Sequence, residues 1–379
     1  MSGLLRVGLV GCGVITQRTA AGIAAIVSER AAAITALCDL NSSNLDTVAG
    51  KLANTEQISR FTDLDTLLSA ECCDALILAT PIGMHFAQVE RALQRGVHVY
   101  THKTLARTRA ECEQLDALAR QADLRLAASP GQVLLPAYER AVELIANGVL
   151  GRIVSVDASA EAAPHRFEAE RQDEAPREGD PYSWEWYHLK DAGGGPLDDM
   201  FVYPLAFLTE AFGELDEASV YGELVTPRIE WRGRVVEATA FDSYTGVGRI
   251  AGTPVTMRSS FSSNTQHDRW GTIVIRGTRA ALEIVKYNDL DYSLYITPNS
   301  GPATAEEHPV FRGEQVQRYG DRECHVLVDI REFIDAVQEH RHVRGATAAN
   351  AARTASALRM IEDSAARSGI RTTRQAGAN

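Results

Sequence analysis

Short apolar runs and longer stretches with apolar residues at helical spacing alternate along the first third of the chain. The apolar runs predict strands at residues 4–10, 33–38, 75–79, 97–100 and 124–128. The stretches between them predict helices at residues 14–26, 44–53, 85–94 and 107–121. Regular alternation of this kind is typical of a parallel sheet with helices on both faces. We therefore predict an α/β domain with a parallel sheet over residues 1–125.

Beyond that point come longer segments rich in strand-forming residues, which are typical of a mainly antiparallel sheet. Strands are predicted at residues 153–160, 219–224, 237–244, 255–261, 272–276 and 281–285. Helices are predicted at residues 136–147, 199–211, 325–339 and 347–366. We predict a second, α+β domain over residues 126–379 with a large, mainly antiparallel sheet. The terminal helix is free to pack back on the first domain.

Composition narrows the function classes. The chain has 379 residues, of which 45% are hydrophobic and 23% charged, and its formal net charge is −12. A nucleic-acid surface needs clustered Lys and Arg, so we expect a small-molecule substrate and no nucleic-acid partner. The sequence shows no signal peptide and no apolar run long enough for a membrane span, so we expect a cytoplasmic protein with no membrane partner. None of the six cysteines has CxxC spacing, which favours reduced thiols and no bound metal.

A glycine motif follows the first predicted strand and opens the first predicted helix. Gly11 and Gly13 fit the first two glycines of a dinucleotide-binding fingerprint, while Thr16 occupies the third position. Gly11 permits the tight turn, and Gly13 lets the backbone approach a pyrophosphate at the helix N-terminus, beside Val14 and Ile15. Because the motif lies between strand and helix, it predicts a Rossmann-type dinucleotide site.

An acidic residue ends the second predicted strand. Asp39 there would accept hydrogen bonds from the ribose hydroxyls and repel a 2′-phosphate. Leu40 and Asn41 follow, so no arginine is placed to hold that phosphate. The pattern predicts NAD rather than NADP as the cofactor; the alternative is that Asp39 only caps the next turn.

Two further segments carry candidate site residues. Thr80 and Pro81 follow the strand at residues 75–79, at the sheet edge where ligands of open α/β sheets bind, and His85 begins the next helix. His85 is a candidate cofactor contact, although such a residue is more often part of an ordinary helix start. Lys103 lies just past the strand at residues 97–100, where a lysine can polarise a substrate oxygen; its alternative is a solvated surface position.

Three glycines, residues 193–195, precede a second candidate pair. They let the backbone pass close to a ligand. Asp199 opens the following helix, and Tyr203 lies four residues later on the same face. A carboxylate and a phenol together can move a proton, whereas the alternative is a helix cap beside a packed aromatic ring.

These motifs together resemble the glucose–fructose oxidoreductase, inositol dehydrogenase and rhizopine-catabolism family, usually written Gfo/Idh/MocA. The resemblance covers nearly the whole chain and rests on residues 8–13, 79–81, 96–103, 148–151, 193–195, 276–278 and 331–336. It implies that Lys103 is the family's catalytic lysine and Asp199 its characteristic aspartate. Tyr203 falls where most members carry His and some sugar oxidoreductases carry Tyr.

The chain departs from the family pattern around Lys103. His102 replaces the usual Glu, and Thr104 replaces a proline whose peptide bond is typically cis. A cis bond costs several times more before a residue other than proline, so we expect a trans peptide before Thr104. This departure keeps a non-catalytic interpretation open.

The resemblance implies hydride transfer between NAD and a carbon bearing a secondary alcohol in a sugar, glycoside or cyclitol. Tyr203 would take the hydroxyl proton, Lys103 would stabilise the alkoxide, and Asp199 would orient Lys103 or the substrate. His102, expected with Lys103 beside the cofactor, is the second candidate for the proton.

Aromatic and polar residues cluster at positions 182–190, just before the three glycines. Trp186 and His188 are candidate sugar contacts, and packing of these rings inside the protein is the alternative. His165 and Arg166 are similar candidates in a predicted irregular loop.

Three functions therefore compete. The leading one is a dehydrogenase or reductase that forms a homodimer or homotetramer through the open face of its second sheet. The second is a glycoside-cleaving enzyme that retains NAD and shows no net change in NADH. The third is a regulator that senses NAD or sugar without turnover.

Overall fold

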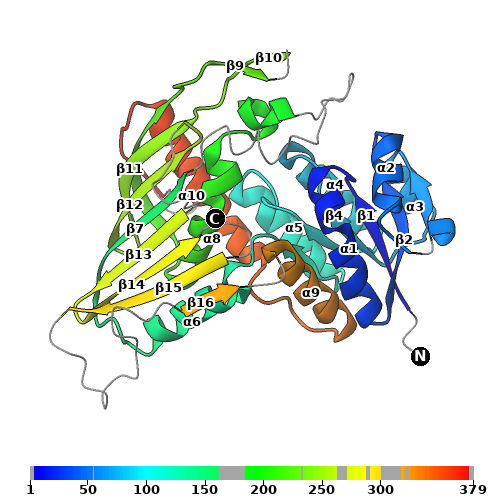
Figure 1. Ribbon diagram of the computed structural model, residues 1–379, viewed down its shortest axis with the longest axis horizontal. Coiled ribbons are helices and arrows are strands. Elements are labelled where there is room, and N and C mark those ends of the chain that lie inside the picture. Colours follow the sequence, from blue (N-terminus) through cyan, green and yellow to red (C-terminus); the bar gives the residue numbers. More distant parts are fainter. Residues whose placement is uncertain are drawn as a thin grey trace. The chain divides into compact units, whose positions relative to one another are not determined.

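The computed structural model describes residues 4–53, 55–161, 184–231, 234–262, 271–286, 291–299, 317–320 and 324–374. The chain divides into two compact units (Figure 1). The first unit comprises residues 1–131 and 323–355, and the second comprises residues 132–322 and 356–379. No helix among the described residues is both long and apolar enough to cross a membrane.

The first unit contains a parallel sheet with the strand order β3-β2-β1-β4-β5-β6. Its strands are β1 (Leu5–Val10), β2 (Ala32–Cys38), β3 (Ser59–Phe61), β4 (Ala75–Leu78), β5 (His98–Thr101) and β6 (Leu126–Ala128). Its helices include α1 (Val14–Glu29), α2 (Ser42–Ala49), α3 (Leu64–Ser69), α4 (Ile82–Gln94), α5 (Arg109–Gln121) and α9 (His325–Gln338). The predicted α/β fold is confirmed, although β3 was not predicted from the sequence.

Each face of this sheet contributes to a separate hydrophobic core. Successive residues of a strand point to opposite faces, so Leu9 and Ile77 belong to one core while Val10 and Leu76 belong to the other. Helices α3, α4 and α5 complete the second core, and α1, α2 and α9 complete the first.

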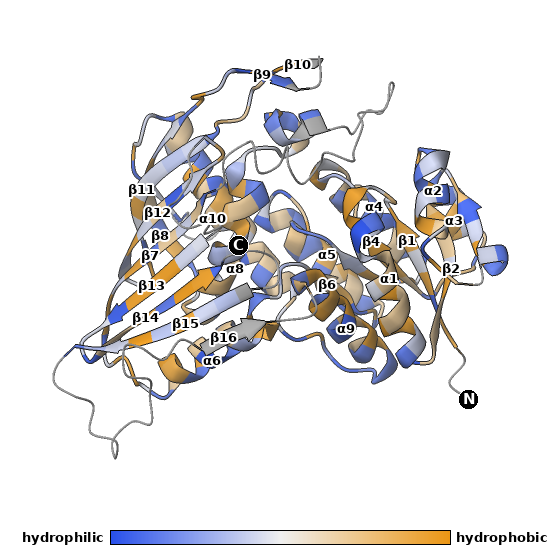
Figure 2. Cartoon of the chain, viewed as in Figure 1, coloured by the Kyte–Doolittle hydropathy of each residue, from blue (hydrophilic) through white to orange (hydrophobic). Residues whose placement is uncertain are grey.

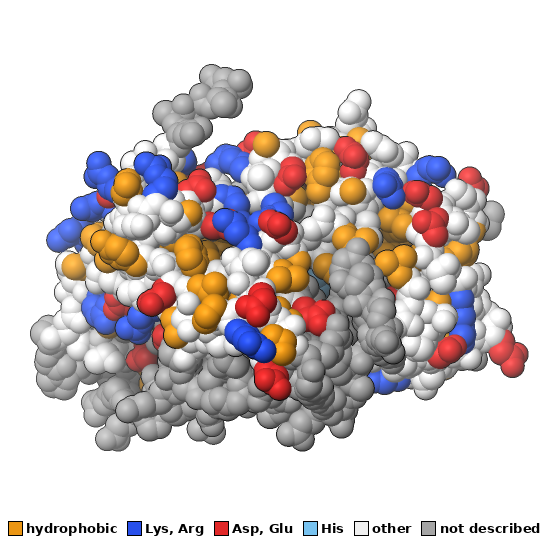
Figure 3. Space-filling model, turned by 90° about the horizontal axis from the view of Figure 1, so that it is seen from above, with side chains coloured by type: hydrophobic (Ala, Val, Ile, Leu, Met, Phe, Trp, Pro, Cys, Tyr) orange, Lys and Arg blue, Asp and Glu red, His pale blue; other side chains and the backbone are white. Residues whose placement is uncertain are grey.

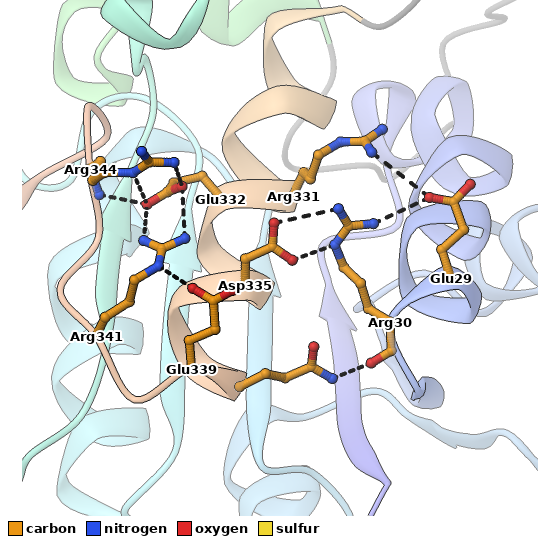
Figure 4. Close-up of polar contacts among 9 residues, drawn as sticks. Glu29, Arg30, Arg331, Glu332, Asp335, Glu339, Arg341 and Arg344 are labelled. Atoms are coloured by element: carbon orange, nitrogen blue, oxygen red, sulfur yellow. Dashed lines mark hydrogen bonds and ion pairs between the residues drawn. The ribbon is translucent and has the colours of Figure 1, made fainter.

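Helix α9 belongs to the first unit although it follows the second in sequence. Phe333 is wholly buried in the core beside α1. At the rim, Arg30 Nε lies 2.5 Å from Asp335 Oδ1, and Arg331 lies 3.8 Å from Glu29 (Figure 4). Apolar burial therefore carries most of the attachment, and the half-exposed ion pairs fix the register of the helix.

Helix α9 also holds the segment that follows it. Glu332, 5% exposed, accepts hydrogen bonds from the backbone N–H of Arg344 at 2.8 Å and from its guanidinium at 3.0 Å (Figure 4). Arg341 reaches the same carboxylate. These two arginines hold the pKa of Glu332 below its usual value even though burial acts in the opposite direction.

The second unit contains a mixed, mostly antiparallel sheet with the order β16-β15-β14-β13-β7-β12-β11-β8-β17. Its strands are β7 (Ile153–Glu161), β8 (Leu215–Glu223), β11 (Ser243–Ile250), β12 (Thr253–Ser260), β13 (Gly271–Gly277), β14 (Ala280–Lys286), β15 (Asp291–Pro298), β16 (Gln317–Gly320) and β17 (Thr372–Thr373). Strands β9 (Arg228–Trp231) and β10 (Arg234–Glu237) form a separate pair. Only β7 and β12 pair in parallel among the described strands of the large sheet, so the predicted α+β architecture is confirmed.

Helices cover one face of the large sheet. Helix α8 (Val202–Ala211) packs on β7 and β13, and α6 (Pro136–Ala146) packs on β14 and β15. Figure 2 shows hydrophobic residues along β13, β14 and α8. The opposite face carries the exposed residues Thr245, Val247 and Tyr221; Thr245 and Tyr221 are direct partners across β11 and β8.

Helix α10 (Ala348–Ala366) runs from the first unit into the second.

On the surface seen in Figure 3, acidic and basic side chains of described residues are interspersed with hydrophobic ones rather than gathered by sign.

Candidate active site

The glycine turn after β1 lets neighbouring backbone come very close. Gly11 has φ +83°, and a Cβ there would lie 2.7 Å from the backbone carbonyl of Ala79, so only glycine fits. Gly13 is the N-cap of α1 in an extended conformation, and a Cβ there would meet nothing within 4 Å. No side chain caps the first turn of α1, which begins with Val14 and the exposed Ile15. Its backbone N–H groups therefore remain available for an anionic ligand.

Thr16 explains the imperfect third position of the fingerprint. Its side chain is 3% exposed, and its Oγ1 donates a 2.5 Å hydrogen bond to the carbonyl of Gly11. The hydroxyl thus stabilises the turn from inside, at the position where the fingerprint places a glycine for helix–strand packing.

Asp39 fixes the same turn from the end of β2. One carboxylate oxygen accepts the backbone N–H of Cys12 at 2.7 Å, and the other accepts the N–H of Asn41 at 2.8 Å and the amide of Asn44 at 3.1 Å. The side chain therefore does cap the next turn, as the alternative interpretation had it. A carboxylate has about four lone-pair sites, so one remains for a ribose hydroxyl.

The structure gives His85 a different place from the one expected. Its side chain is fully buried, and its ring nitrogens lie 2.6 Å from the carbonyl oxygen of Thr104 and 2.7 Å from that of Thr80. Burial lowers its pKa even though both carbonyls favour the charged ring. Direct contact with a cofactor is incompatible with this position; His85 instead ties the segment of Thr80 and Pro81 to the segment after Lys103.

Lys103 is half-buried and is followed by a cis peptide bond. The expectation of a trans bond before Thr104 is wrong. His102, also half-buried, has its pKa lowered to about 3 by burial and by the nearby charges of His85, His325 and Lys103. Its imidazole is therefore neutral at physiological pH, and its low pKa makes it a weak proton acceptor.

Asp199 and Tyr203 lie in the second unit, at the start of α8. A π-helical turn, η5 (Leu197–Phe201), precedes α8, so the single helix predicted from residue 199 is wrong at its first turn. Gly195 has φ +100°, and a Cβ added there would lie 3.1 Å from the carbonyl oxygen of Phe241. Both Asp199 and Tyr203 are half-buried, which leaves each side chain partly accessible.

The neighbouring aspartate has a structural role. Asp198 is 6% exposed, and both of its oxygens lie 2.6 Å from one guanidinium nitrogen of Arg359 on α10. Because Asp198 is committed to this ion pair, Asp199 remains the candidate for the site.

The aromatic segment before the glycines is described in part. His188 ends the short helix η3 (Trp184–His188), and its ring lies edge-on to Phe261 with centroids 6.4 Å apart. Its carbonyl accepts the backbone N–H groups of Thr239 and Ala240. The side chain of Trp186, and all of His165 and Arg166, lie outside the described residues.

The structure therefore brings the candidate residues together in two sets. The first unit contains the candidate cofactor-binding residues, including the candidate catalytic lysine: Gly11, Gly13, Val14, Ile15, Asp39, Thr80, Pro81, His85, His102 and Lys103. The second unit holds Asp199, Tyr203 and His188. Among the described residues, no three His, Cys, Asp or Glu side chains are grouped as a metal site, and all six cysteines are free.

Two family models match this chain. Residues 5–129 match the oxidoreductase family with an NAD-binding Rossmann fold, and residues 138–283 match the GFO/IDH/MocA C-terminal domain. The chain belongs to the Gfo/Idh/MocA family. Its first unit is accordingly the NAD-binding Rossmann domain of that family.

Relatives of this Gfo/Idh/MocA protein act on sugars by name. The chain is 27% identical over 201 residues to dTDP-3,4-didehydro-2,6-dideoxy-alpha-D-glucose 3-reductase from Actinomadura kijaniata, covering 53% of this chain and 54% of that protein. It is 26% identical over 199 residues to D-xylose dehydrogenase from Paenarthrobacter nicotinovorans, covering 52% and 49%. The chain thus spans about half the length of these relatives.

Solved structures share the fold over almost the whole chain. The WlbA dehydrogenase from Bordetella pertussis, in complex with NADH and UDP-GlcNAcA, superposes with a TM-score of 0.72 at 21% identity, covering 98% of this chain and 99% of that one. Levoglucosan dehydrogenase, in complex with NADH and L-sorbose, gives a TM-score of 0.78 at 17% identity, covering 97% and 98%.

Proposed function

We propose that this protein is an NAD-dependent oxidoreductase that transfers a hydride between nicotinamide and a secondary alcohol or ketone of a sugar, glycoside or cyclitol. The observation that carries the proposal is the first unit's geometry. An open helix N-terminus at Gly13, a carboxylate at Asp39 and a lysine at Lys103 follow three strands of one parallel sheet. Ligands of such sheets bind at the carboxyl ends of the strands.

The first unit fits the cofactor. Backbone N–H groups at the start of α1 would hold the pyrophosphate, and the space above Gly13 is open to its oxygens. Asp39 would accept a ribose hydroxyl, and its negative charge opposes a 2′-phosphate. Bound NAD supplies the hydride acceptor or donor, while the protein supplies position and charge.

Tyr203 takes the proton of the substrate hydroxyl in the oxidation direction and returns it in the reduction direction. The ammonium of Lys103 stabilises the developing alkoxide, and Asp199 orients Lys103 or the substrate. His102 is the second candidate for the proton, although its pKa of about 3 makes its imidazole a weak base. His188 and Trp186 are the proposed sugar contacts.

A second function stays in view because of one relative. The chain is 31% identical over 93 residues to 2,7-anhydro-N-acetylneuraminate hydratase from Mediterraneibacter gnavus, covering 24% of this chain and 25% of that protein. That name denotes addition of water to a sugar derivative rather than net oxidation. An enzyme that retains NAD and changes a glycosidic bond would likewise show no net change in NADH.

Substitutions of the two proposed proton-handling groups test the assignment. Lys103→Met and Tyr203→Phe keep most of the side-chain bulk, so folding and NAD binding should persist. Loss of acid–base help should lower turnover by about 10²–10⁴-fold. A matched control is Lys51→Met, because Lys51 is exposed.

The assay is NADH absorbance and product chromatography over a panel of sugars, glycosides and cyclitols. Turnover with NADH change supports the dehydrogenase, and cleavage at constant NADH supports the second function. Full activity of both variants on a confirmed substrate would refute the site assignment, and no turnover of the parent protein on the whole panel would refute both enzymatic functions.

A further inference from the structure

Strand β14 carries a lysine where its pattern calls for an apolar residue. Leu282, Ile284 and Lys286 are alternate residues of β14 and therefore share a face. They are 0%, 1% and 6% exposed, which identifies this as the buried face of the sheet. Lysine is almost never buried to this extent unless its charge is compensated.

Aromatic rings surround the buried ammonium. Lys286 Nζ lies 4.5 Å from the ring centroid of Tyr203 and 5.7 Å from that of Tyr292. Tyr292 is the direct partner of Lys286 across β14 and β15, and it is 1% exposed. Its ring in turn contacts Tyr138 of α6 edge-on, with centroids 5.6 Å apart. The contact with Tyr203 is within the range in which a cation is attracted to a ring face.

We propose that Lys286 is a positioning residue for Tyr203: its ammonium fixes the ring and favours the phenolate over the phenol. This inference rests on the proposed role of Tyr203 as the proton acceptor. An opposite charge within about 4–6 Å lowers the pKa of an acid by about 1–3 units. A tyrosine in water ionises near pH 10, so a shift of this size makes a tyrosine base usable closer to neutral pH.

The other charges near Tyr203 do not replace Lys286. Asp199, on the preceding turn, is an acid and supplies no positive charge that could favour the phenolate. On β14, Glu283 points to the opposite face of the sheet from Lys286. Several other charged groups on these elements form ion pairs: Asp157 with Arg276, Glu161 with Arg258, Asp198 with Arg359, and Arg140 with Glu143. Glu139 of α6 and Glu210 of α8 are acids and supply no positive charge.

Two buried tyrosines, Tyr138 and Tyr292, also lie near Lys286. Burial raises the pKa of Tyr138, and the charge of Lys286 acts against that rise. Tyr138 and Tyr292 are 3% and 1% exposed, whereas Tyr203 is half-buried. Tyr203 is therefore the one of these three rings that combines contact with Lys286 and partial accessibility.

The test is the ionisation of Tyr203 itself, measured without turnover. Ultraviolet tyrosinate absorbance is titrated against pH for the parent, Tyr203→Phe, Lys286→Met and the double variant. The difference between each background and its Tyr203→Phe counterpart isolates Tyr203. We expect the midpoint to be about 1–3 pH units higher in Lys286→Met, and Lys286→Arg, which keeps the charge, should stay near the parent.

Folding should not obstruct this experiment. Methionine keeps the length of the lysine side chain and suits the apolar face that Leu282 and Ile284 share, and Lys286→Gln serves as a second neutral variant. Equal midpoints in the parent and both neutral variants would overturn the inference.

Kinetics then separate this inference from the proposed function. On a confirmed substrate, one limb of the pH profile of kcat/KM reports ionisation of the base. Lys286→Met should shift that limb by the same amount as it shifts the tyrosinate midpoint. The affinity for the cofactor should stay unchanged. A tyrosinate shift without any shift in the rate profile supports the contact of Lys286 with Tyr203 and refutes Tyr203 as the base.

Discussion

Substitution of Gly13 by alanine should separate cofactor binding from folding. Gly13 has φ −73° and ψ −164°, which any residue adopts, and an added Cβ meets no atom within 4 Å. The methyl group would instead enter the space in which we place the pyrophosphate.

The magnitude follows from two opposing effects on folding and one on binding. Replacing glycine removes freedom from the unfolded chain and gains about 0.4–1 kcal/mol. Alanine is a poorer N-cap than glycine by a similar amount, so the free energy of unfolding should stay within roughly 0.5 kcal/mol of the parent. Loss of one backbone hydrogen bond to a charged phosphate costs about 1.5–3 kcal/mol. This corresponds to roughly 10- to 100-fold weaker binding of NAD.

Two other glycines provide matched controls. Gly96 has φ +75° with nothing within 4 Å of an added Cβ, so Gly96→Ala should lose about 1–2 kcal/mol of stability and keep its NAD affinity. Gly11 has a similar φ but faces the carbonyl of Ala79 at 2.7 Å, so Gly11→Ala should lose more stability and also lose NAD affinity. Calorimetric titration with NAD and urea unfolding of each variant supply the measurements. A Gly13→Ala protein that binds NAD as tightly as the parent would contradict the placement of the pyrophosphate.

Three further predictions follow from the same structure. Asp39 should make NAD bind more tightly than NADP in calorimetric titrations, and the reverse order would sink the assignment. The exposed face with Tyr221 and Val247 should associate between subunits, so sedimentation at micromolar concentration should show a dimer or tetramer; a clean monomer argues against it. Burial raises the pKa of Asp329 to about 7, above the unfolded value of about 3.9. Stability should therefore fall as pH rises through this window, and urea unfolding of Asp329→Asn, which carries no such proton, should lack that component.

The sequence was informative wherever the hydrophobic pattern was strong. The apolar runs of β1, β2, β4, β5 and β6 predicted the parallel sheet, and Gly11 and Gly13 predicted the turn at its edge. Strand β3 has three residues and two exposed side chains, so it leaves no apolar run to detect. The predicted strand at residues 237–244 was misplaced: β11 begins at Ser243, and Gly246 and Gly248 hide its pattern because glycine is depleted from strands.

The sequence did not reveal the long-range contacts of His85 and Lys286. His85 contacts Thr104, which lies 19 residues further along the chain, and only the folded backbone shows that its ring bridges two carbonyls. Lys286 lies one residue past the predicted strand at residues 281–285, although it ends the observed β14. The one signal that could have identified it is its spacing of two residues from Ile284 and four from Leu282, which places a charged residue on the same face as two apolar ones.

The attachment of α9 to the first unit has a consequence for how the protein is made. The core beside α1 needs Phe333, Ile334 and their neighbours, yet on the order of 200 residues of the second unit are synthesised before them. At ribosomal rates of about 5–20 residues per second, the apolar face of α1 remains uncovered for on the order of 10–40 s before α9 is synthesised. A nascent chain arrested before residue 323 should therefore expose the apolar face of α1 and bind chaperones, whereas one released after residue 355 should not.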